Sequence, residues 1–310
     1  MRNSYIEAGG RRIVVSGRAL RIARIDGDTY RFFEDPEPIL ADLRKSHDRV
    51  DLFTFMQRLS EASPRYNYRV EQDNLAVLEV RSFDHWWNEQ IGFKARNKAK
   101  QAEKKGVVLR QTTFDESLAR GIWKIYNESP IRQGRKFFNY GKTPDTVRRE
   151  ASTFLDSSIF IGAFFEHNLI GFAKLTMDET KTQAGLMHII ATLEHREKAP
   201  TNALLAHAVR ACSDRGIRYL VYSQFAYGNK THDSLSDFKE RNGFRRIDLP
   251  RYYVPLNPIG WIALTIGLHK SIHHHVPEPV IALFRRSRAA WYRRSVSQLP
   301  STSSRAVTEI

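Results

Sequence analysis

Basic residues that could bind an anionic ligand gather in a polar loop near the middle of this chain. Arg132 and Arg135 are separated by a glutamine and a glycine, and an arginine fork binds a phosphate or carboxylate through two hydrogen bonds at once. Tyr140 and Lys230 are grouped with them as candidates for substrate binding. The loop predicts an anionic acceptor, such as a nucleotide sugar or a lipid-linked phosphate. A loop whose arginines are simply solvated fits the same residues.

A second candidate for anion binding lies at a predicted helix start. Pro200 suits the first helical turn, because the N–H that it lacks would have no partner there. The N–H groups left free at a helix start, together with the positive end of the helix dipole, bind phosphate. The residues predicted to hold a pyrophosphate are Lys198, Ala199, Pro200, Thr201, Asn202 and Ala203, with Arg196 as an added cation.

Charge and composition limit the classes of partner. The chain has 310 residues and a formal charge of +15. Residues 86–110 and residues 257–310 each hold seven Lys or Arg and two Glu, so each carries a net charge of +5. Nucleic acid, an anionic membrane and a phosphorylated ligand are the partners that such segments favour. One cysteine and the lack of an apolar run near the N-terminus predict a cytoplasmic protein.

The spacing of apolar residues and turn signals predicts four regions. They are an N-terminal α/β lobe (1–85), a main domain (86–256), an amphipathic helical segment (257–297) and a disordered tail (298–310). The local expectations include strands at 11–15, 20–25 and 29–33, one continuous basic helix at 86–105, a helix capped by Thr113, and a hairpin of strands at 158–165 and 169–177.

The order of elements between residues 183 and 256 carries a family resemblance. An apolar strand leads into the anion-facing helix start, and a second strand, a short helix and Asn242-Gly243-Phe244 follow. This order resembles the second half of a GNAT acyltransferase and is also similar to the Fem-type aminoacyl transferases of peptidoglycan cross-bridge synthesis. Residues 102–107 resemble the end of a Fem-type basic helix. Three further segments, 125–128, 132–135 and 250–256, resemble GNAT-like bacterial proteins linked to cell-surface glycan biosynthesis.

The resemblance implies a fold and an activity. The fold would be α/β and GNAT-like, with a mixed, mostly antiparallel sheet flanked by helices and a C-terminal helical tail. The activity would be transfer of an acyl group from acetyl-CoA, or another acyl-CoA, to an amine or hydroxyl on a small-molecule or lipid-linked glycan acceptor, without a metal. The glycines that GNAT proteins usually carry at the pyrophosphate turn are absent from 196–203.

Acylation of an amine needs a base, a donor to the carbonyl oxygen and an acid for the leaving group. GNAT enzymes often use a carboxylate near the fourth strand as the base, and Glu194 takes that place, with His188 and His195 beside it. His188 is a further catalytic candidate, and Leu193 and His195 are counted with the donor-binding residues. The resemblance implies a backbone N–H near Leu193 as the oxyanion donor.

Two alternatives stay open. The usual GNAT tyrosine acid is missing, since Lys239 stands at its position, and Tyr227 is the implied substitute. This loss favours a non-catalytic GNAT-like subunit that docks on a membrane or an enzyme complex. The basic helix and the missing glycines favour a Fem-type transferase that draws an amino acid from aminoacyl-tRNA. Other nucleic acids are not expected, because residues 94–105 lack interleaved aromatics.

The C-terminal segment fits two descriptions. Trp261 and Trp291 near arginines suit the inner face of an anionic membrane, and the same pattern fits a helical pair that packs on the domain. His269 and His273 share one helix face, but without further ligands at matching spacing they do not predict a metal site.

Overall fold

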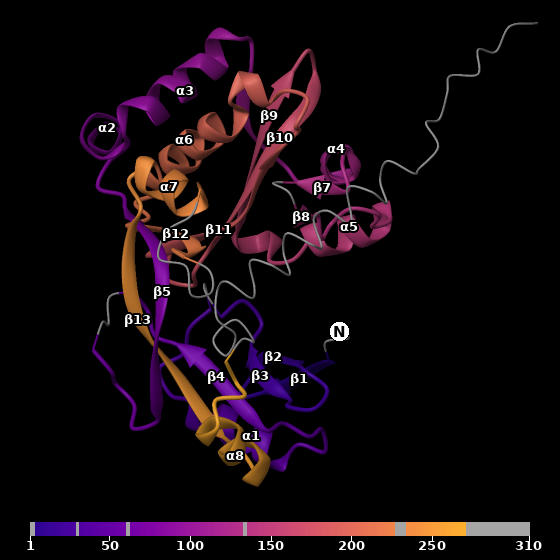
Figure 1. Ribbon diagram of the computed structural model, residues 1–310, viewed down its shortest axis with the longest axis vertical. Helices are drawn as coiled ribbons and strands as arrows, with labels where there is room; N and C mark the ends of the chain where they lie inside the picture. Colours follow the sequence, from indigo (N-terminus) through magenta and orange to yellow (C-terminus); the bar gives the residue numbers. More distant parts are fainter. Residues whose placement is uncertain (1–3, 29–30, 60–62, 133–134, 227–233, 271–310) are drawn as a thin grey trace, which may run out of the picture.

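One large sheet organises the chain. The computed structural model describes residues 4–28, 31–59, 63–132, 135–226 and 234–270. In these residues an 11-stranded sheet has the order β1-β2-β3-β4-β13-β5-β12-β11-β10-β9-β6 (Figure 1). Two neighbouring pairs, β3 with β4 and β11 with β12, are parallel, and the others are antiparallel. The predicted α/β fold with a mixed, mostly antiparallel sheet is confirmed.

The strands of the sheet are β1 (Ser4–Ala8), β2 (Arg11–Ser16), β3 (Ile22–Ile25), β4 (Leu52–Met56), β5 (Arg69–Glu79), β6 (Val108–Thr112), β9 (Ser158–Phe165), β10 (Asn168–Met177), β11 (Gln183–Ala191), β12 (Tyr219–Gln224) and β13 (Arg245–Pro255). A separate small pair consists of β7 (Ile131–Arg132) and β8 (Arg135–Lys136). The helices are α1 (Glu37–Lys45), α2 (Phe83–His85), α3 (Phe93–Lys104), α4 (Glu116–Asn127), α5 (Pro144–Ala151), α6 (Pro200–Ser213), α7 (Ser234–Arg241) and α8 (Pro258–Thr265), with short helical turns η1 (Trp86–Gln90), η2 (Leu155–Ser157) and η3 (Arg196–Lys198).

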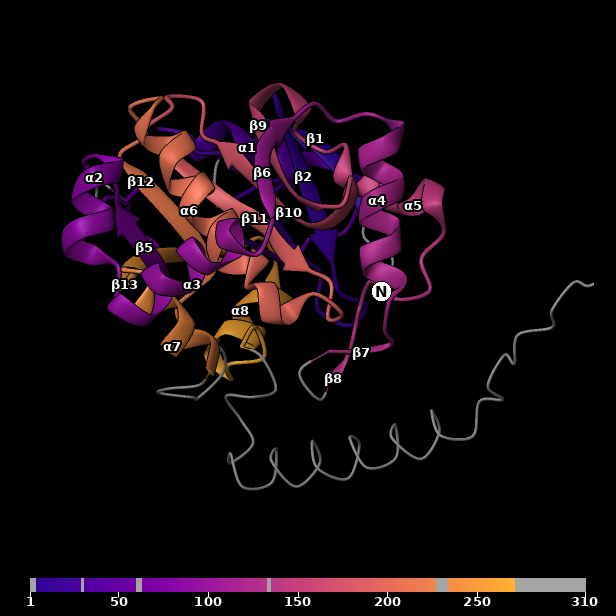
Figure 2. The ribbon, with the colours of Figure 1, turned by 90° about the horizontal axis from the view of Figure 1, so that it is seen from above.

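Helices cover both faces of the half of the sheet that contains β9, β10 and β11. Seen from above, α3 and α6 lie on one face and α4 and α5 on the other (Figure 2). The first layer buries Trp86 and Leu204, and the second buries Ile122 and Phe172. A third core forms where α1 places Leu40 against β1 to β4. Burial of these apolar faces is the main force that fixes the helices on the sheet.

The sheet continues across residue 85, where the sequence predicts a domain boundary. β5 belongs to the predicted N-terminal lobe, yet it lies between β12 and β13 and pairs antiparallel with both. Arg251 of β13 adds polar bonds here, to Asp73 at 2.7 Å and to Asp28 at 3.1 Å. Burial opposes the charge of Arg251, but the two carboxylates outweigh it and raise the pKa of the guanidinium. The lobe and the main domain therefore share their sheet.

The helix predicted at residues 86–105 is broken in the structure. Ile91 is extended, with φ −73° and ψ 131°, and α3 begins only at Phe93. The N–H of Gly92 donates to the carbonyl of Arg241 at 2.8 Å, and a Cβ at Gly92 would come within 3.1 Å of the same oxygen. The contact with α7 thus replaces the helical hydrogen bond, so the continuous helix is wrong.

Other local expectations have mixed outcomes. The hairpin is confirmed as β9 and β10. The helix cap predicted at Thr113 is wrong, because Asp115 caps α4 by accepting from the N–H of Leu118 at 2.7 Å. Residues 31–33 form no strand, and residues 29–30 lie outside the described residues.

The C-terminal segment is partly described. α8 places Ala263 and Leu264 against Leu52 and so packs on the sheet. Among the described residues, no helix is both long enough and apolar enough to cross a membrane. The rest of the predicted segment, with Trp291 and the tail at 298–310, lies outside the described residues.

Candidate functional site

Two parallel strands separate at the centre of the sheet. β11 and β12 pair only from Gln183 opposite Tyr219 to Gly185 opposite Val221, although β11 runs on to Ala191. Beyond Gly185, β11 still pairs with β10, and no described strand pairs with its other edge. An unpaired strand edge presents N–H and C=O groups in a row, which can bind an extended ligand that carries amides.

Irregularities in both strands explain the separation. In β11 the register against β10 shifts by one residue, because Lys174 pairs with His188 and Leu175 with Leu186. In β12 the register against β5 breaks after Val221, where Ser223 has φ 50°. Bulges of this kind bend a strand and increase its twist. Each irregularity comes two residues after the last shared pair, so the strands diverge there.

The predicted phosphate turn joins the end of β11 to α6. Ala199 is left-handed, with φ 54°, and Pro200 begins the helix. Pro200 has no N–H, and the N–H of Asn202 already donates to the carbonyl of Ala199 at 3.2 Å. Lys198 lies over the ring of Phe165 at 4.0 Å. The turn therefore offers fewer free N–H groups to a pyrophosphate than an ordinary helix start does. A pyrophosphate held here would depend more on cationic side chains such as Lys198.

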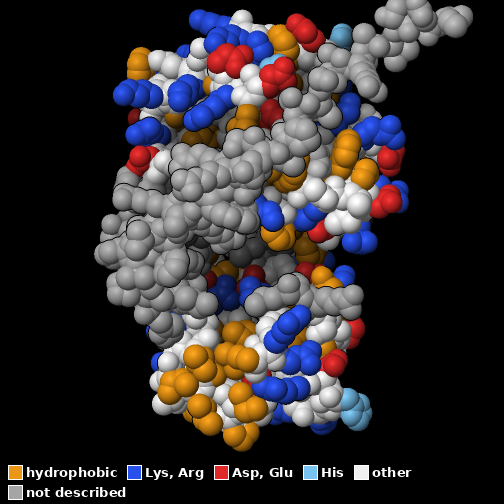
Figure 3. Space-filling view, turned by 45° about the vertical axis from the view of Figure 1, so that its right-hand side comes forward, with side chains coloured by type: hydrophobic (Ala, Val, Ile, Leu, Met, Phe, Trp, Pro, Cys, Tyr) orange, Lys and Arg blue, Asp and Glu red, His pale blue; other side chains and the backbone are white. Residues whose placement is uncertain are grey.

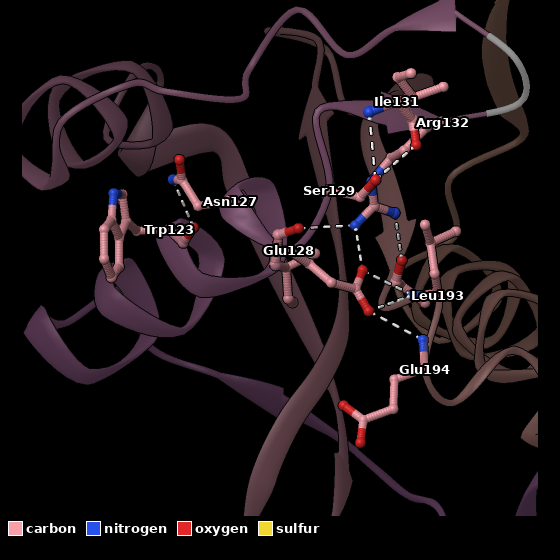
Figure 4. Close-up of polar contacts among 10 residues, drawn as sticks. Trp123, Asn127, Glu128, Ser129, Ile131, Arg132, Leu193 and Glu194 are labelled. Atoms are coloured by element: carbon pink, nitrogen blue, oxygen red, sulfur yellow. Dashed lines mark hydrogen bonds and ion pairs between the residues drawn. The ribbon is translucent and has the colours of Figure 1, made fainter. Parts of the chain in front are cut away.

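A carboxylate from α4 occupies the turn that follows β11. Glu128 accepts hydrogen bonds from the N–H groups of Leu193, at 2.8 Å, and Glu194, at 2.9 Å (Figure 4). Two adjacent N–H groups that point at one carboxylate form an anion-binding turn. The oxyanion role predicted for the Leu193 N–H stays a prediction, and it requires Glu128 to give up this position.

Arg132 fixes that arrangement. Its guanidinium donates to the carboxylate of Glu128 at 2.8 Å, to the carbonyl of Ala191 at 2.6 Å and to the carbonyl of Ile125 at 2.7 Å. Its side chain is only 11% exposed, and burial lowers the pKa of its guanidinium. Arg132 thus ties the end of α4 to the end of β11. A role for it in substrate binding stays a prediction, and a substrate would have to compete with these bonds.

The other predicted residues are spread around this turn. Glu194 is exposed, and its carboxylate points away from Glu128 (Figure 4). The ring of His195 meets the ring of Phe165 edge-on at 5.4 Å. Among the predicted helix-start residues, Thr201 is half-buried, whereas Asn202 and Ala203 are buried.

The predicted substrate residues are only partly described. Arg135, on β8, and Tyr140 are exposed. Tyr227 and Lys230 lie outside the described residues. Their roles stay predictions.

Known structures share the fold of this chain. No family profile matches the sequence, and no curated protein matches it either. The C-terminal domain of a protein described as a lysylphosphatidylglycerol synthetase from Agrobacterium fabrum superimposes with a TM-score of 0.55 at 14% identity, over 85% of this chain and 87% of that chain. FemX superimposes with a TM-score of 0.53 at 8% identity, over 77% and 83%. This chain has a GNAT-like fold, which it shares with these two structures. L-PGS from Bacillus licheniformis shares the fold, with a TM-score of 0.53 at 14% identity, over 85% and 88%.

Within the GNAT-like fold, a polar cluster lies between β11 and α4. The Oη of Tyr126 lies 3.5 Å from the Nδ1 of His188. Burial, together with the charge of Lys174, lowers the pKa of His188 to about 4, so its imidazole is neutral near pH 7. Burial also lowers the pKa of Lys174 to about 8, and its Nζ donates to the carbonyl of Ala151 at 2.9 Å.

Sequence reasoning missed the partners of His188. Tyr126 lies in the segment 125–128 whose resemblance is noted above, but 62 residues separate it from His188. Lys174 stands opposite His188 on β10. The only sequence signal for this contact was that Lys174 is a basic residue within the apolar run of β10. A neutral imidazole can accept a proton, and the catalytic role predicted for His188 stays a prediction.

His188 should make stability depend on pH. Its folded-state pKa lies below its ordinary value of 6.5, at about 4. As pH falls through this window, the unfolded chain takes up a proton that the folded chain resists, so folding weakens. We expect the wild type to lose about 2 kcal/mol more than His188→Gln between pH 7.5 and pH 4.5 in urea titrations. Parallel pH profiles for the two proteins would contradict this.

The position of the usual tyrosine acid in the GNAT-like fold is buried. Lys239 lies in α7, its Nζ donates to the carbonyl of Gln224, and it lies 4.9 Å from the ring centre of Tyr222. Lys239 thus ties α7 to the end of β12. Among the described residues, no group of three or more His, Cys, Asp or Glu could hold a metal ion.

Proposed function

We propose that this chain is an acyltransferase that moves an acyl group from acyl-CoA to an amine or hydroxyl, on an acceptor such as a cell-surface glycan precursor. The separation of β11 from β12 beside the start of α6 carries the proposal. An extended donor arm can add its amides to the free edge of β11, and the turn from Arg196 to Ala199 lies at the end of that strand. Such an arm matches the amides and phosphates of a CoA thioester.

The reacting groups would meet at the end of β11. Glu194 is exposed in the turn that follows this strand, where its carboxylate can take the proton of an incoming amine. The exposure of Glu194 supports its assignment as the carboxylate that GNAT enzymes often use as the base. His188 is the second candidate, because its imidazole is neutral near pH 7.

The donor proposal predicts a charge-dependent affinity. Lys198→Glu should weaken acetyl-CoA binding at least about tenfold, because a cation near the phosphates becomes an anion. Isothermal titration at two salt concentrations measures the affinity, which should also fall as salt rises. Arg24→Glu is the matched control, since Arg24 is an exposed cation on β3. If Lys198→Glu and Arg24→Glu bind acetyl-CoA with equal affinity, the turn does not bind the phosphates of acyl-CoA.

Aminoacyl-tRNA is the second candidate donor, and the basic face of α3 favours it. Lys94, Lys98, Lys104 and Lys105 are exposed on or just after α3. Lys105 donates to the carbonyl of Glu197 at 2.8 Å, so this face reaches the donor turn itself. Cations in a row bind a phosphate backbone with a strong dependence on salt. The same titration with charged tRNA distinguishes the donors: tight, salt-sensitive binding of tRNA without binding of acetyl-CoA would favour the Fem-type reaction.

The proposed place of action is the cytoplasm or the inner face of the membrane, where lipid-linked acceptors are available. The alternative of a non-catalytic subunit predicts that neither donor binds in these titrations.

A further inference from the structure

The outer face of α8 is apolar, although its inner face already packs on the sheet. Gly260, Ala263 and Leu264 are buried against the body of the protein. Trp261 is 64% exposed and Ile262 is 59% exposed. A helix that is apolar on both faces normally has both faces covered, so the outer face needs an explanation.

The apolar residues continue past the end of α8. The apex, as we name it, consists of Ile259, Trp261, Ile262, Ile266 and Leu268. These are five of the twelve exposed large hydrophobic residues found in the described part of the chain. In Figure 3 hydrophobic side chains gather at the lower end of the molecule, where Figure 1 shows α8, and Lys and Arg side chains lie beside them. A concentration of this kind marks an interaction surface.

Basic residues surround the base of α8. Leu20 packs against the cluster of Leu52, Ala263 and Leu264, and the exposed Arg18 lies two residues before Leu20 in the chain. Arg49 is bonded to Asp51 at 2.8 Å and is 44% exposed. Asp51 is buried against Arg49, so these two charges offset each other, and Glu71 contacts Lys270 just after the apex. With Asp48 also exposed, the exposed Arg18 is the cation on which the charge argument rests.

We propose that the apex is a docking surface for an anionic lipid bilayer. A tryptophan among aliphatic side chains enters the boundary between headgroups and acyl chains, while flanking arginines bind the lipid phosphates. The apex lies at one end of the long axis of the molecule, so a flat surface can reach it (Figure 1). Docking through the apex would place the protein at a membrane whether its donor is acyl-CoA or aminoacyl-tRNA.

The test uses the full-length chain and two kinds of vesicle, phosphatidylcholine alone and phosphatidylcholine with 30 mol% phosphatidylglycerol as a stated probe composition. The wild type should co-sediment with the anionic vesicles, and salt should weaken the binding. The triple variant Trp261→Ser/Ile262→Ser/Ile266→Ser should bind at least about tenfold more weakly, because the buried apolar area is lost. Arg18→Glu should weaken binding at least about fivefold, since each basic residue near the surface contributes roughly 1 kcal/mol.

The matched control is Phe93→Ser, which removes an aromatic ring that is 69% exposed on the basic helix α3. It should leave vesicle binding unchanged. Quenching of tryptophan fluorescence by brominated phosphatidylglycerol should be smaller in Trp261→Phe than in the wild type. Unchanged binding by the triple variant, or a loss of binding in Phe93→Ser, would overturn the proposal. A dimer on gel filtration that the triple variant abolishes would instead make the apex a self-association surface.

Discussion

Replacing Glu194 by glutamine is expected to lower turnover by about 10²–10⁴-fold, with little change in donor affinity. Glutamine keeps the shape of the side chain and removes its ability to accept a proton. Glu194 is exposed at the end of β11, so the change should not disturb folding. The measurement is transfer of radiolabelled acetyl from acetyl-CoA to an amino sugar phosphate. Residual activity should rise with pH, because more of the acceptor amine is then already deprotonated.

The matched control for this prediction is Glu197→Gln. Glu197 is an exposed carboxylate in the same connection, three residues along, in contact with Lys198 at 3.6 Å. It should change turnover by less than about threefold, in keeping with an exposed ion pair. Near wild-type turnover in Glu194→Gln, together with a large loss in His188→Gln, would move the role of base to the imidazole.

Replacing Arg132 by alanine is expected to lower the free energy of unfolding by roughly 1–3 kcal/mol. The change would remove the hydrogen bonds of Arg132 to the carbonyls of Ile125 and Ala191 and to the carboxylate of Glu128, which keeps the N–H groups of Leu193 and Glu194 as donors. Each buried acceptor that loses its partner costs the free energy of its desolvation. Urea unfolding measures the loss. Arg132→Lys should recover only a small part of it, because one ammonium group cannot reproduce the planar fork.

An exposed pair on α4 provides the control. Glu116 and Arg120 have the same spacing as Glu128 and Arg132, but their side chains are 65% and 68% exposed and their closest atoms are 3.9 Å apart. Arg120→Ala should change the free energy of unfolding by less than about 0.5 kcal/mol. Similar losses of unfolding free energy for Arg120→Ala and Arg132→Ala would contradict a stabilising role for the hydrogen bonds of Arg132.

Local physics made part of the fold predictable from the sequence. The hairpin of β9 and β10 follows from two apolar runs joined by three turn residues, and its register confirms it. Pro200 at the start of α6 also follows from chemistry within a few residues. The family resemblance added the fold class. The continuous helix predicted at residues 86–105 was wrong, because the N–H of Gly92 donates to the carbonyl of the distant Arg241 instead of to a carbonyl within the helix.

The candidate site was predictable in place but not in its contacts. The end of β11 and the start of α6 could be located, because apolar periodicity and Pro200 mark them. Only the tertiary structure showed that Glu128, 65 residues before Leu193, occupies the N–H groups of the next turn. The structure also showed that Arg132, a predicted substrate-binding residue, donates to Glu128, and its role toward a substrate stays a prediction. The charge and the hydrogen-bonding groups of a residue can be read from the sequence. Its partners cannot, because they lie on distant segments that come together only in the folded chain.

The sequence by itself determined the residue types, the local strands and helices, and the lack of glycines at the donor turn. The tertiary structure decided that β5 enters the sheet between β12 and β13, and that β11 and β12 separate. It also decided that α8 covers Leu52 with one face and leaves Trp261 exposed on the other. The physical reason is range: periodicity, caps and turns act over a few residues, whereas strand order and burial depend on which distant surfaces pack together.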